Sequence, residues 1–281
     1  MAFSIGIFAN IWWGASALYW NNLSHLDTLT LLAHRCVWGL PILITIMMWQ
    51  GSLLPTIKAM RNWRLSGILI ITTMLITINW GLFLYASGHG MLVQSALGYF
   101  MLPLASVALG MIFLQERANY AQWLAIACAV AGLFNAIWSA GGLSWLAVTL
   151  ALSFGTYGIL RKQISVGPVE GMAMETAILS PPAMAWLLWN GSGFGDGTLI
   201  QDSMLLLAGA VTAAPLVGYV LAARGLNMFR LGMLSYVNPT LQFLIGWLVL
   251  GETITISQAV TFGCIWLGLI VYSANTFYNS R

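Results

Sequence analysis

Long apolar stretches separated by short polar connections make up almost the whole chain of 281 residues. Ten stretches occur, covering approximately residues 3–20, 28–49, 65–86, 91–114, 119–138, 143–160, 169–189, 203–223, 229–250 and 257–275. An α-helix rises about 1.5 Å per residue, so about twenty residues span a hydrocarbon core about 30 Å thick. The pattern therefore predicts an all-α integral membrane protein with ten transmembrane helices.

The composition agrees with this pattern. Hydrophobic residues make up 60% of the chain and charged residues only 6%, with a mean hydropathy of +0.87, whereas a soluble domain is about 25% charged. The longest connections, 50–64 and 190–202, leave no room for a soluble domain. Function is therefore expected within the membrane or at its edges.

The basic residues predict the orientation of the chain, because Lys and Arg near helix ends are retained on the cytoplasmic side. With the N-terminus inside, nine of the ten Lys and Arg fall in cytoplasmic segments, and these nine are Lys58, Arg61, Arg64, Arg117, Arg161, Lys162, Arg224, Arg230 and Arg281. We therefore expect both termini in the cytoplasm. No basic cluster indicates a nucleic-acid partner.

The two halves of the chain resemble each other. Adding 136 to a position, or 141 for the earlier helices, gives the pairs Phe100–Tyr236, Pro103–Pro239, Gly132–Gly268, Gly14–Gly155, His34–Glu175 and Pro41–Pro182. We interpret this as a duplication with repeats 1–138 and 139–281. Because each repeat holds five helices, an odd number, the second must enter the membrane from the opposite side. A five-plus-five inverted-topology repeat is typical of transporters with a midplane substrate site and alternating access.

Two charged residues lie within the predicted spanning helices. Arg35 is suited to binding a substrate carboxylate, because a guanidinium group forms two parallel charge-assisted bonds with it. Alternatively, its side chain extends toward the membrane surface and anchors the helix. Glu175, in the matching helix of the second repeat, is a candidate proton or cation carrier, or else a hydrogen-bonded structural carboxyl. The two side chains are at mirror-related depths and are not expected to touch.

Six further candidates for substrate contact bring aromatic rings, amides or hydroxyls near the membrane midplane. They are Trp13, Asn79, Tyr99, Tyr157, Tyr236 and Gln242. Core packing or a helix–helix hydrogen bond is the alternative for each. Trp20, near a predicted helix end, is interpreted instead as part of an interfacial aromatic belt.

Pro103 and Pro239 are predicted to bend their helices, because a proline inside a helix removes a backbone hydrogen bond. Their matching positions in the two repeats suggest that the bends shape the transport path. The alternative is a static packing kink.

Several segments resemble a known family. LAHRCVWGLP, NWGLFLYASGHG, SALGYFMLPL, LSFGTYGILRK and NPTLQFLIGWLVLGE are similar to the RarD branch of the EamA-type drug/metabolite transporter superfamily. The resemblance implies a transporter of the bacterial inner membrane for small metabolites such as amino acids, or for drugs such as chloramphenicol. It also implies a central cavity lined mostly by the first, third, fourth, sixth, eighth and ninth helices. The chain departs from the branch at Asn21, Thr30 and Gln94, where the branch has charged residues.

Other functional classes fit the sequence less well. No Gly-x-Ser-x-Gly, His-Glu-x-x-His or Walker-type phosphate loop occurs, so we predict no catalytic residue, metal site or cofactor, and a membrane enzyme is least favoured. A passive channel and a non-transporting scaffold remain as alternatives to a secondary transporter. The expected partners are a small-molecule substrate and membrane lipid. A monomer is favoured over a dimer built on the small residues Ala121, Ala125 and Ala129.

Overall fold

The computed structural model describes residues 1–113, 115, 119–139 and 144–278, without the side chains of 103, 106, 107, 109 and 272–278. These residues form helices and no strand. The helices are α1 (Ala2–Asn21), α2 (Thr28–Gln50), α3 (Leu53–Ala59), α4 (Trp63–Gly88), α5 (Leu92–Phe113), α6 (Tyr120–Ser139), α7 (Trp145–Gln163), α8 (Pro168–Asn190), α9 (Leu199–Gly225), α10 (Met228–Ser235), α11 (Val237–Leu244), the π-helix η1 (Ile245–Val249) and α12 (Ile256–Tyr278).

The described residues of each predicted apolar stretch are mainly helical, but 229–250 is divided into α10, α11 and η1, and the connection 50–64 contains the short helix α3. Within the described residues, α2, α4, α6 and α9 are long and apolar enough to cross a membrane by length and hydropathy. Shorter apolar stretches occur at Leu92–Leu102 in α5 and at Ile256–Val271 in α12.

Polar side chains fix where several helices begin. Asp27 caps α2 by accepting hydrogen bonds from the amides of Leu29 and Thr30 at 2.9 and 3.0 Å, and Asn227 caps α10 in the same way. Such caps satisfy amides that have no partner within the helix. Gly51 ends α2 with a φ of 68°, a left-handed conformation that glycine adopts without steric cost.

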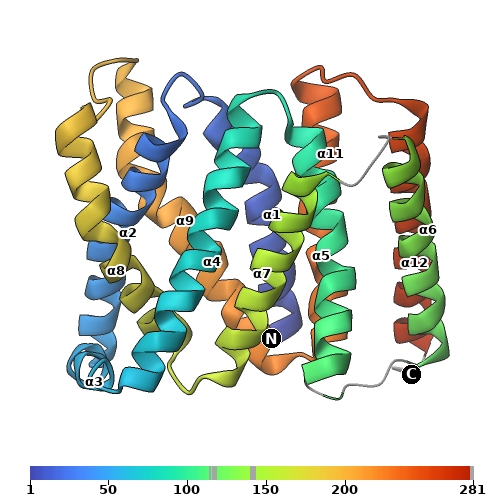
Figure 1. The fold of residues 1–281 in the computed structure, drawn as a ribbon, viewed down its shortest axis with the longest axis horizontal. Coiled ribbons are helices and arrows are strands. Elements are labelled where there is room, and N and C mark those ends of the chain that lie inside the picture. The colour runs from blue at the N-terminus through green and yellow to red at the C-terminus, as the bar shows by residue number, and fades with distance from the viewer. Residues whose placement is uncertain (114, 116–118, 140–143, 279–281) are drawn as a thin grey trace.

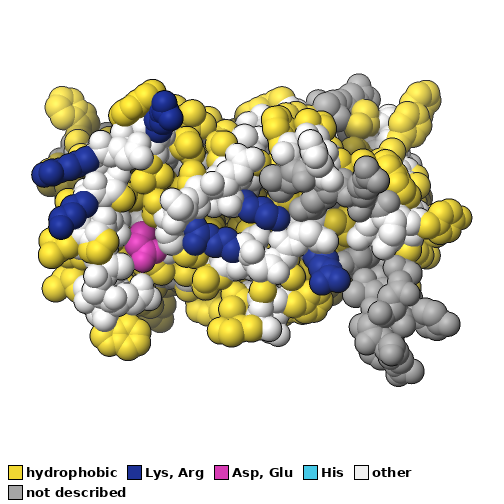
Figure 2. Space-filling model, turned by 90° about the horizontal axis from the view of Figure 1, so that it is seen from below, with side chains coloured by type: hydrophobic (Ala, Val, Ile, Leu, Met, Phe, Trp, Pro, Cys, Tyr) yellow, Lys and Arg dark blue, Asp and Glu magenta, His cyan; other side chains and the backbone are white. Residues whose placement is uncertain are grey.

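The long helices run up and down through the bundle, and α1 begins at the lower end where α12 terminates (Figure 1). Lys and Arg side chains are spread over this lower face (Figure 2). Lys58, Arg61 and Arg64 lie in or beside the α2–α4 connection, and Arg230 lies in α10. Arg117 and Arg281 fall outside the described residues.

Helices of the first half pack mainly on helices of the second half. The most extensive pairs are α6 with α12, α2 with α8, α5 with α7, α1 with α9 and α2 with α9, followed by α4 with α7 and α1 with α11. The α6–α12 pair stands at one end of the molecule (Figure 1). In the described part of the chain, the core is therefore shared between the two halves.

Glycines allow the close approach of α6 and α12. A Cβ added at Gly132 would lie 3.2 Å from the Cβ of Cys264, and one added at Gly268 would lie 3.2 Å from the Cβ of Cys128. Both distances are tighter than ordinary van der Waals contact. Close packing through small residues is a common way for helices to associate in membranes.

The stretch around Pro239 is interrupted. Helix α10 ends at Ser235, and α11 begins at Val237 after Tyr236. Proline lacks an amide hydrogen, so Pro239 cannot bond the carbonyl of Ser235 four residues earlier, and the break lies at this carbonyl. Pro103 lies inside the continuous helix α5, and its side chain is outside the described part of the chain.

Candidate functional site

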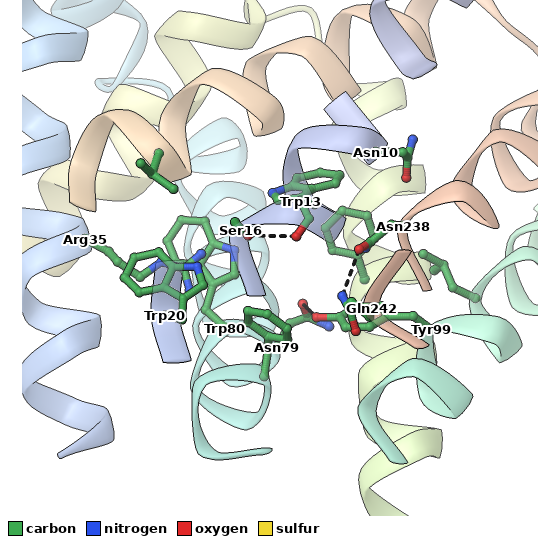
Figure 3. Close-up of a pocket in the computed structure, with 14 residues that line it drawn as sticks. Asn10, Trp13, Ser16, Trp20, Arg35, Asn79, Trp80, Tyr99, Asn238 and Gln242 are labelled. Carbon is green, nitrogen blue, oxygen red and sulfur yellow. Dashed lines mark hydrogen bonds between the residues drawn. The ribbon is translucent and has the colours of Figure 1, made fainter. Parts of the chain in front are cut away.

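A cavity lies between helices of both halves (Figure 3). It contains about 510 Å³ of empty space, including its mouth. Its lining comes from α1, α2, α4, α5, α7, α9 and α11, and consists of Asn10, Trp13, Ser16, Trp20, Arg35, Asn79, Trp80, Phe83, Tyr99, Leu102, Phe154, Val211, Asn238 and Gln242.

The guanidinium group of Arg35 lies at one end of this cavity (Figure 3). Its Cζ lies 4.7 Å from the ring centroid of Trp20 and 4.5 Å from that of Trp80. Its Nε donates to Thr212 Oγ1 at 2.9 Å. The residue is only 4% exposed, so its head does not extend to the surface. The two tryptophan faces stabilise the cation by cation–π attraction, which is stronger away from water.

One nitrogen of Arg35 is left without a partner. Within the described residues Nη1 makes no hydrogen bond, and no carboxylate pairs with this arginine. A buried donor without an acceptor destabilises a protein by about 1–3 kcal/mol, and more when the group is charged. Such an atom is therefore ready to bond a ligand oxygen.

Amide groups lie on the opposite side of the cavity in Figure 3, where Gln242 Nε2 donates to Asn238 Oδ1 at 2.8 Å. Gln242 Oε1 has no hydrogen-bond partner among the described residues, although the side chain is buried. This end of the cavity therefore offers an acceptor, whereas the Arg35 end offers a donor.

Asn79 and Tyr99 form a network within the lining. Tyr99 Oη donates to Asn79 Oδ1 at 3.1 Å, and Asn79 Nδ2 donates to the Leu150 carbonyl at 3.0 Å and to Ser153 Oγ at 3.1 Å. These bonds join α4 and α5 to α7. The Asn79 amide is thus already used in helix–helix hydrogen bonds, so it shapes the cavity wall.

Aromatic rings line the space between the two ends. The ring of Trp13 lies 5.4 Å from that of Phe154, edge to face, and 5.6 Å from that of Tyr219. Such contacts hold the rings rigidly and present a broad apolar surface. The cavity thus combines an apolar wall with separate donor and acceptor ends.

Five of the seven candidates for substrate contact line this cavity, namely Trp13, Arg35, Asn79, Tyr99 and Gln242. The other two, Tyr157 and Tyr236, do not line it, and neither does Glu175, the candidate proton or cation carrier. Tyr236 is buried between α10 and α11, with its ring 5.8 Å from that of Phe100. Tyr157 and Glu175 lie together elsewhere.

Glu175 is the centre of a second buried polar group. Thr72 Oγ1 donates to its Oε1 at 2.6 Å, and Tyr157 Oη donates to its Oε2 at 3.2 Å. Arg161 Nε lies 3.7 Å from Oε1 in an ion pair whose side chains are almost fully buried. As expected, Glu175 and Arg35 have different partners. The sequence places Arg161 correctly near a helix end but gives no sign that it is buried.

The interpretation of Trp20 as an interfacial residue is wrong. Its side chain is 3% exposed and stacks on Arg35. Its position near a helix end suggested the interface, but the side of the helix it occupies faces α2. By contrast, Trp49, Trp63 and Trp138 are 87%, 77% and 78% exposed, as an interfacial belt requires.

Asn10, Ser16, Trp80 and Asn238 are lining residues that were not predicted. A polar residue within a spanning helix is a general signal of function, and Asn10 and Asn238 carry this signal. No group of three His, Cys, Asp or Glu able to hold a metal lies in the described part of the chain. The arrangement is suited to binding a small molecule.

Comparison with known proteins identifies the family. A model described as the EamA-like transporter family matches residues 1–138 and 142–274. The chain belongs to the EamA-like transporter family. It is a RarD-like member, and this membership makes it a membrane-embedded transporter.

Curated EamA-like relatives align along nearly the whole chain. The "Uncharacterized transporter YojE" of Bacillus subtilis is 35% identical over 94% of this chain and 90% of the relative. "Protein RarD" of Escherichia coli is 34% identical over 96% of this chain and 92% of the relative. "Chloramphenicol-sensitive protein RarD" of Pseudomonas aeruginosa is 32% identical over 90% of this chain and 87% of the relative.

A crystal structure of another protein has the same fold. It superposes with a TM-score of 0.69 and covers 97% of this chain and 96% of that chain, at 19% sequence identity. At this identity the match concerns the arrangement of helices alone.

Proposed function

We propose that this protein is a secondary transporter that carries a small amphipathic molecule with a carboxylate and an amino group, such as an amino acid, through the central cavity. The observation that carries the proposal is a pair of unsatisfied atoms in one cavity, the Nη1 donor of Arg35 and the Oε1 acceptor of Gln242. The guanidinium meets the carboxylate, the glutamine oxygen accepts a hydrogen bond from the amino group, and Trp13 with Phe154 covers the apolar part.

Alternating access is part of the proposal, and the exchange of contacts between the halves supports it. Gly132 packs on Cys264, and Gly268 packs on Cys128 at the same distance. Adding 136 to Gly132 and Cys128 gives Gly268 and Cys264. In this pair of contacts a glycine of each half packs on the equivalent cysteine of the other half. Such reciprocal contacts are characteristic of a two-fold axis.

This axis lies across the helices, because α6 and α12 run in opposite directions (Figure 1). The repeats 1–138 and 139–281 would then be inverted relative to each other across ten membrane spans. Rocking of one repeat against the other would open the cavity first to one side of the membrane and then to the other.

We place the protein in the bacterial inner membrane as a monomer with both termini in the cytoplasm. The lower face in Figure 2 would be the cytoplasmic face, because it carries Lys and Arg. The upper end of the cavity would then lie toward the outside.

Flux through vesicles containing the purified protein tests the function. We expect saturable uptake of leucine or phenylalanine with counterflow, in which an internal load of unlabelled solute accelerates entry of labelled solute. Flux that does not saturate would indicate a channel, and no flux for any amino acid would refute the proposal. Chloramphenicol, which lacks a carboxylate, should be carried more slowly than these amino acids.

A further inference from the structure

The Glu175 centre occupies a position equivalent to the Arg35 end of the cavity. Glu175 follows Arg35 by 140 residues, and Thr212 follows Thr72 by the same interval. Arg35 Nε donates to Thr212 Oγ1 at 2.9 Å, and Thr72 Oγ1 donates to Glu175 Oε1 at 2.6 Å. In each half a buried charge therefore bonds a threonine from the other half, and the two charges have opposite signs.

These contacts also correct the alignment of the halves by one residue in α2 and α8. An interval of 141 pairs Pro41 with Pro182 and His34 with Glu175, but the adjacent Pro181 allows an interval of 140 equally well. His34 Nε2 lies 2.7 Å from the Ser192 carbonyl, and among the described residues His34 makes no contact with a threonine like that of Glu175 with Thr72. The interval of 140 is the one that the hydrogen bonds support.

The neighbours of the two charges differ in one decisive way. An interval of 141, which aligns Gly14 with Gly155, places Arg161 at the position equivalent to Trp20. Trp20 leaves the Arg35 guanidinium without an anion, whereas the Arg161 guanidinium lies 3.7 Å from the Glu175 carboxylate. The Arg161 guanidinium thus occupies the position beside Glu175 that a cationic ligand would take.

Arg161 is held loosely for a buried charge. Its Nη2 donates to the carbonyls of Gly167 and Pro168 at 3.4 and 3.2 Å, but its Nε and Nη1 have no hydrogen-bond partner among the described residues. A buried ion pair with unsatisfied donors contributes little net stability. Another cation that bonds Glu175 more completely can therefore compete with Arg161 for this carboxylate, since Glu175 must keep a cationic partner.

A groove on the lower face lies close to this arginine. It holds about 710 Å³ of space open to the surface, and Gly167, Glu170, Thr56 and Asn62 are among its lining residues. Gly167 is also the residue whose carbonyl holds Arg161. Movement of the α7–α8 connection would join the groove to Glu175.

We propose that Glu175, with Thr72 and Tyr157, forms a second binding subsite for an ammonium or guanidinium group, and that Arg161 occupies this subsite while the lower end is closed. The subsite rests on the proposed function, because it would receive the amino group of the carried molecule when the lower end opens. While the upper end is open, Arg35 meets the carboxylate and Gln242 meets the amino group; when the lower end opens, the amino group passes to Glu175.

Chemical rescue of the Arg161→Ala variant tests this subsite. Guanidinium chloride at millimolar concentrations should raise the melting temperature of purified Arg161→Ala by about 3 °C at ten times its dissociation constant. Guanidinium chloride should raise the melting temperature of the Arg161→Ala/Glu175→Gln variant no more than sodium chloride does. Arg224→Ala is the matched control, since Arg224 also bonds carbonyls of the α7–α8 connection. Equal stabilisation of all three variants would overturn the proposal.

A second measurement uses an isosteric change and does not depend on the Arg161→Ala variant. The variant is Thr72→Cys in a chain whose three native cysteines are replaced by alanine. Its new thiol is buried beside Glu175. Adding Glu175→Gln should accelerate its labelling by a membrane-impermeant thiol reagent from the lower face several-fold, because Arg161 loses its partner. An unchanged rate contradicts the subsite.

The two proposals can fail separately. Rescue that depends on Glu175 in a protein that carries no solute would retain the subsite and refute the transport function. Solute flux without Glu175-dependent rescue would retain the function and refute the subsite.

Discussion

Replacement of Arg35 by lysine separates carboxylate recognition from folding. Lysine keeps the positive charge between Trp20 and Trp80, but its ammonium group cannot form the two parallel bonds that a guanidinium makes with a carboxylate. A hydrogen bond to a charged group contributes about 1.5–3 kcal/mol, so the loss of one bond should weaken binding about 10- to 150-fold.

The expected loss of stability in the same variant is smaller. Only the 2.9 Å hydrogen bond to Thr212 is removed, and the cation–π contacts are retained in part. We expect a cost of about 1 kcal/mol, or a decrease of about 2–4 °C in melting temperature.

Isothermal titration of leucine and leucinamide against the purified variants measures the effect. Arg35→Lys should bind leucine about 10- to 150-fold more weakly. Its affinity for leucinamide, which has no carboxylate, should change little. Arg64→Lys is the matched control, because Arg64 also stacks on a tryptophan, Trp63, at 5.4 Å but is exposed. Unchanged leucine binding in Arg35→Lys, or equal losses for the acid and the amide, would refute the carboxylate role.

Three further results are expected. Gln242→Leu removes the free acceptor and should weaken binding of leucine about tenfold while leaving 4-methylpentanoate, which has no amino group, unaffected in titrations; equal losses would point to packing. A cysteine at Asp196 should be labelled by an impermeant reagent only from outside and one at Arg61 only from the cytoplasm, and the reverse pattern would overturn the orientation. Pro239→Ala restores an amide beside the break at Tyr236 and should reduce transport more than the amount of folded protein, whereas parallel losses would indicate a static kink.

The positions of the helices could be predicted from the sequence because a long apolar stretch has few structural choices in lipid. Backbone groups must bond internally there, and a helix does so within one segment. The division of 229–250 was harder to place, since Pro239 predicts a bend while the turn itself lies at Tyr236. The short helix α3 is only seven residues long and had no apolar pattern to mark it.

The site was predictable in part. The depth of Trp13, Arg35 and Gln242 in their helices was enough to select them. An error of one turn in a predicted helix end still leaves such a residue away from the membrane surfaces. Depth alone does not reveal which neighbour a side chain faces. Trp20 was therefore misjudged and the burial of Arg161 was not foreseen, since the first is turned toward Arg35 and the second toward Glu175, and each of these partners is on another helix.

The tight packing of α6 on α12 has a consequence for the making of the protein. Helix α6 completes the first half, but the residue that fits against its Gly132 belongs to α12, which is synthesised much later. During synthesis the small-residue face of α6 must therefore remain against lipid until about 120 more residues have been added. A chain that stops before α12 would keep this face uncovered, so premature termination near the C-terminus should be as damaging to assembly as a much larger truncation.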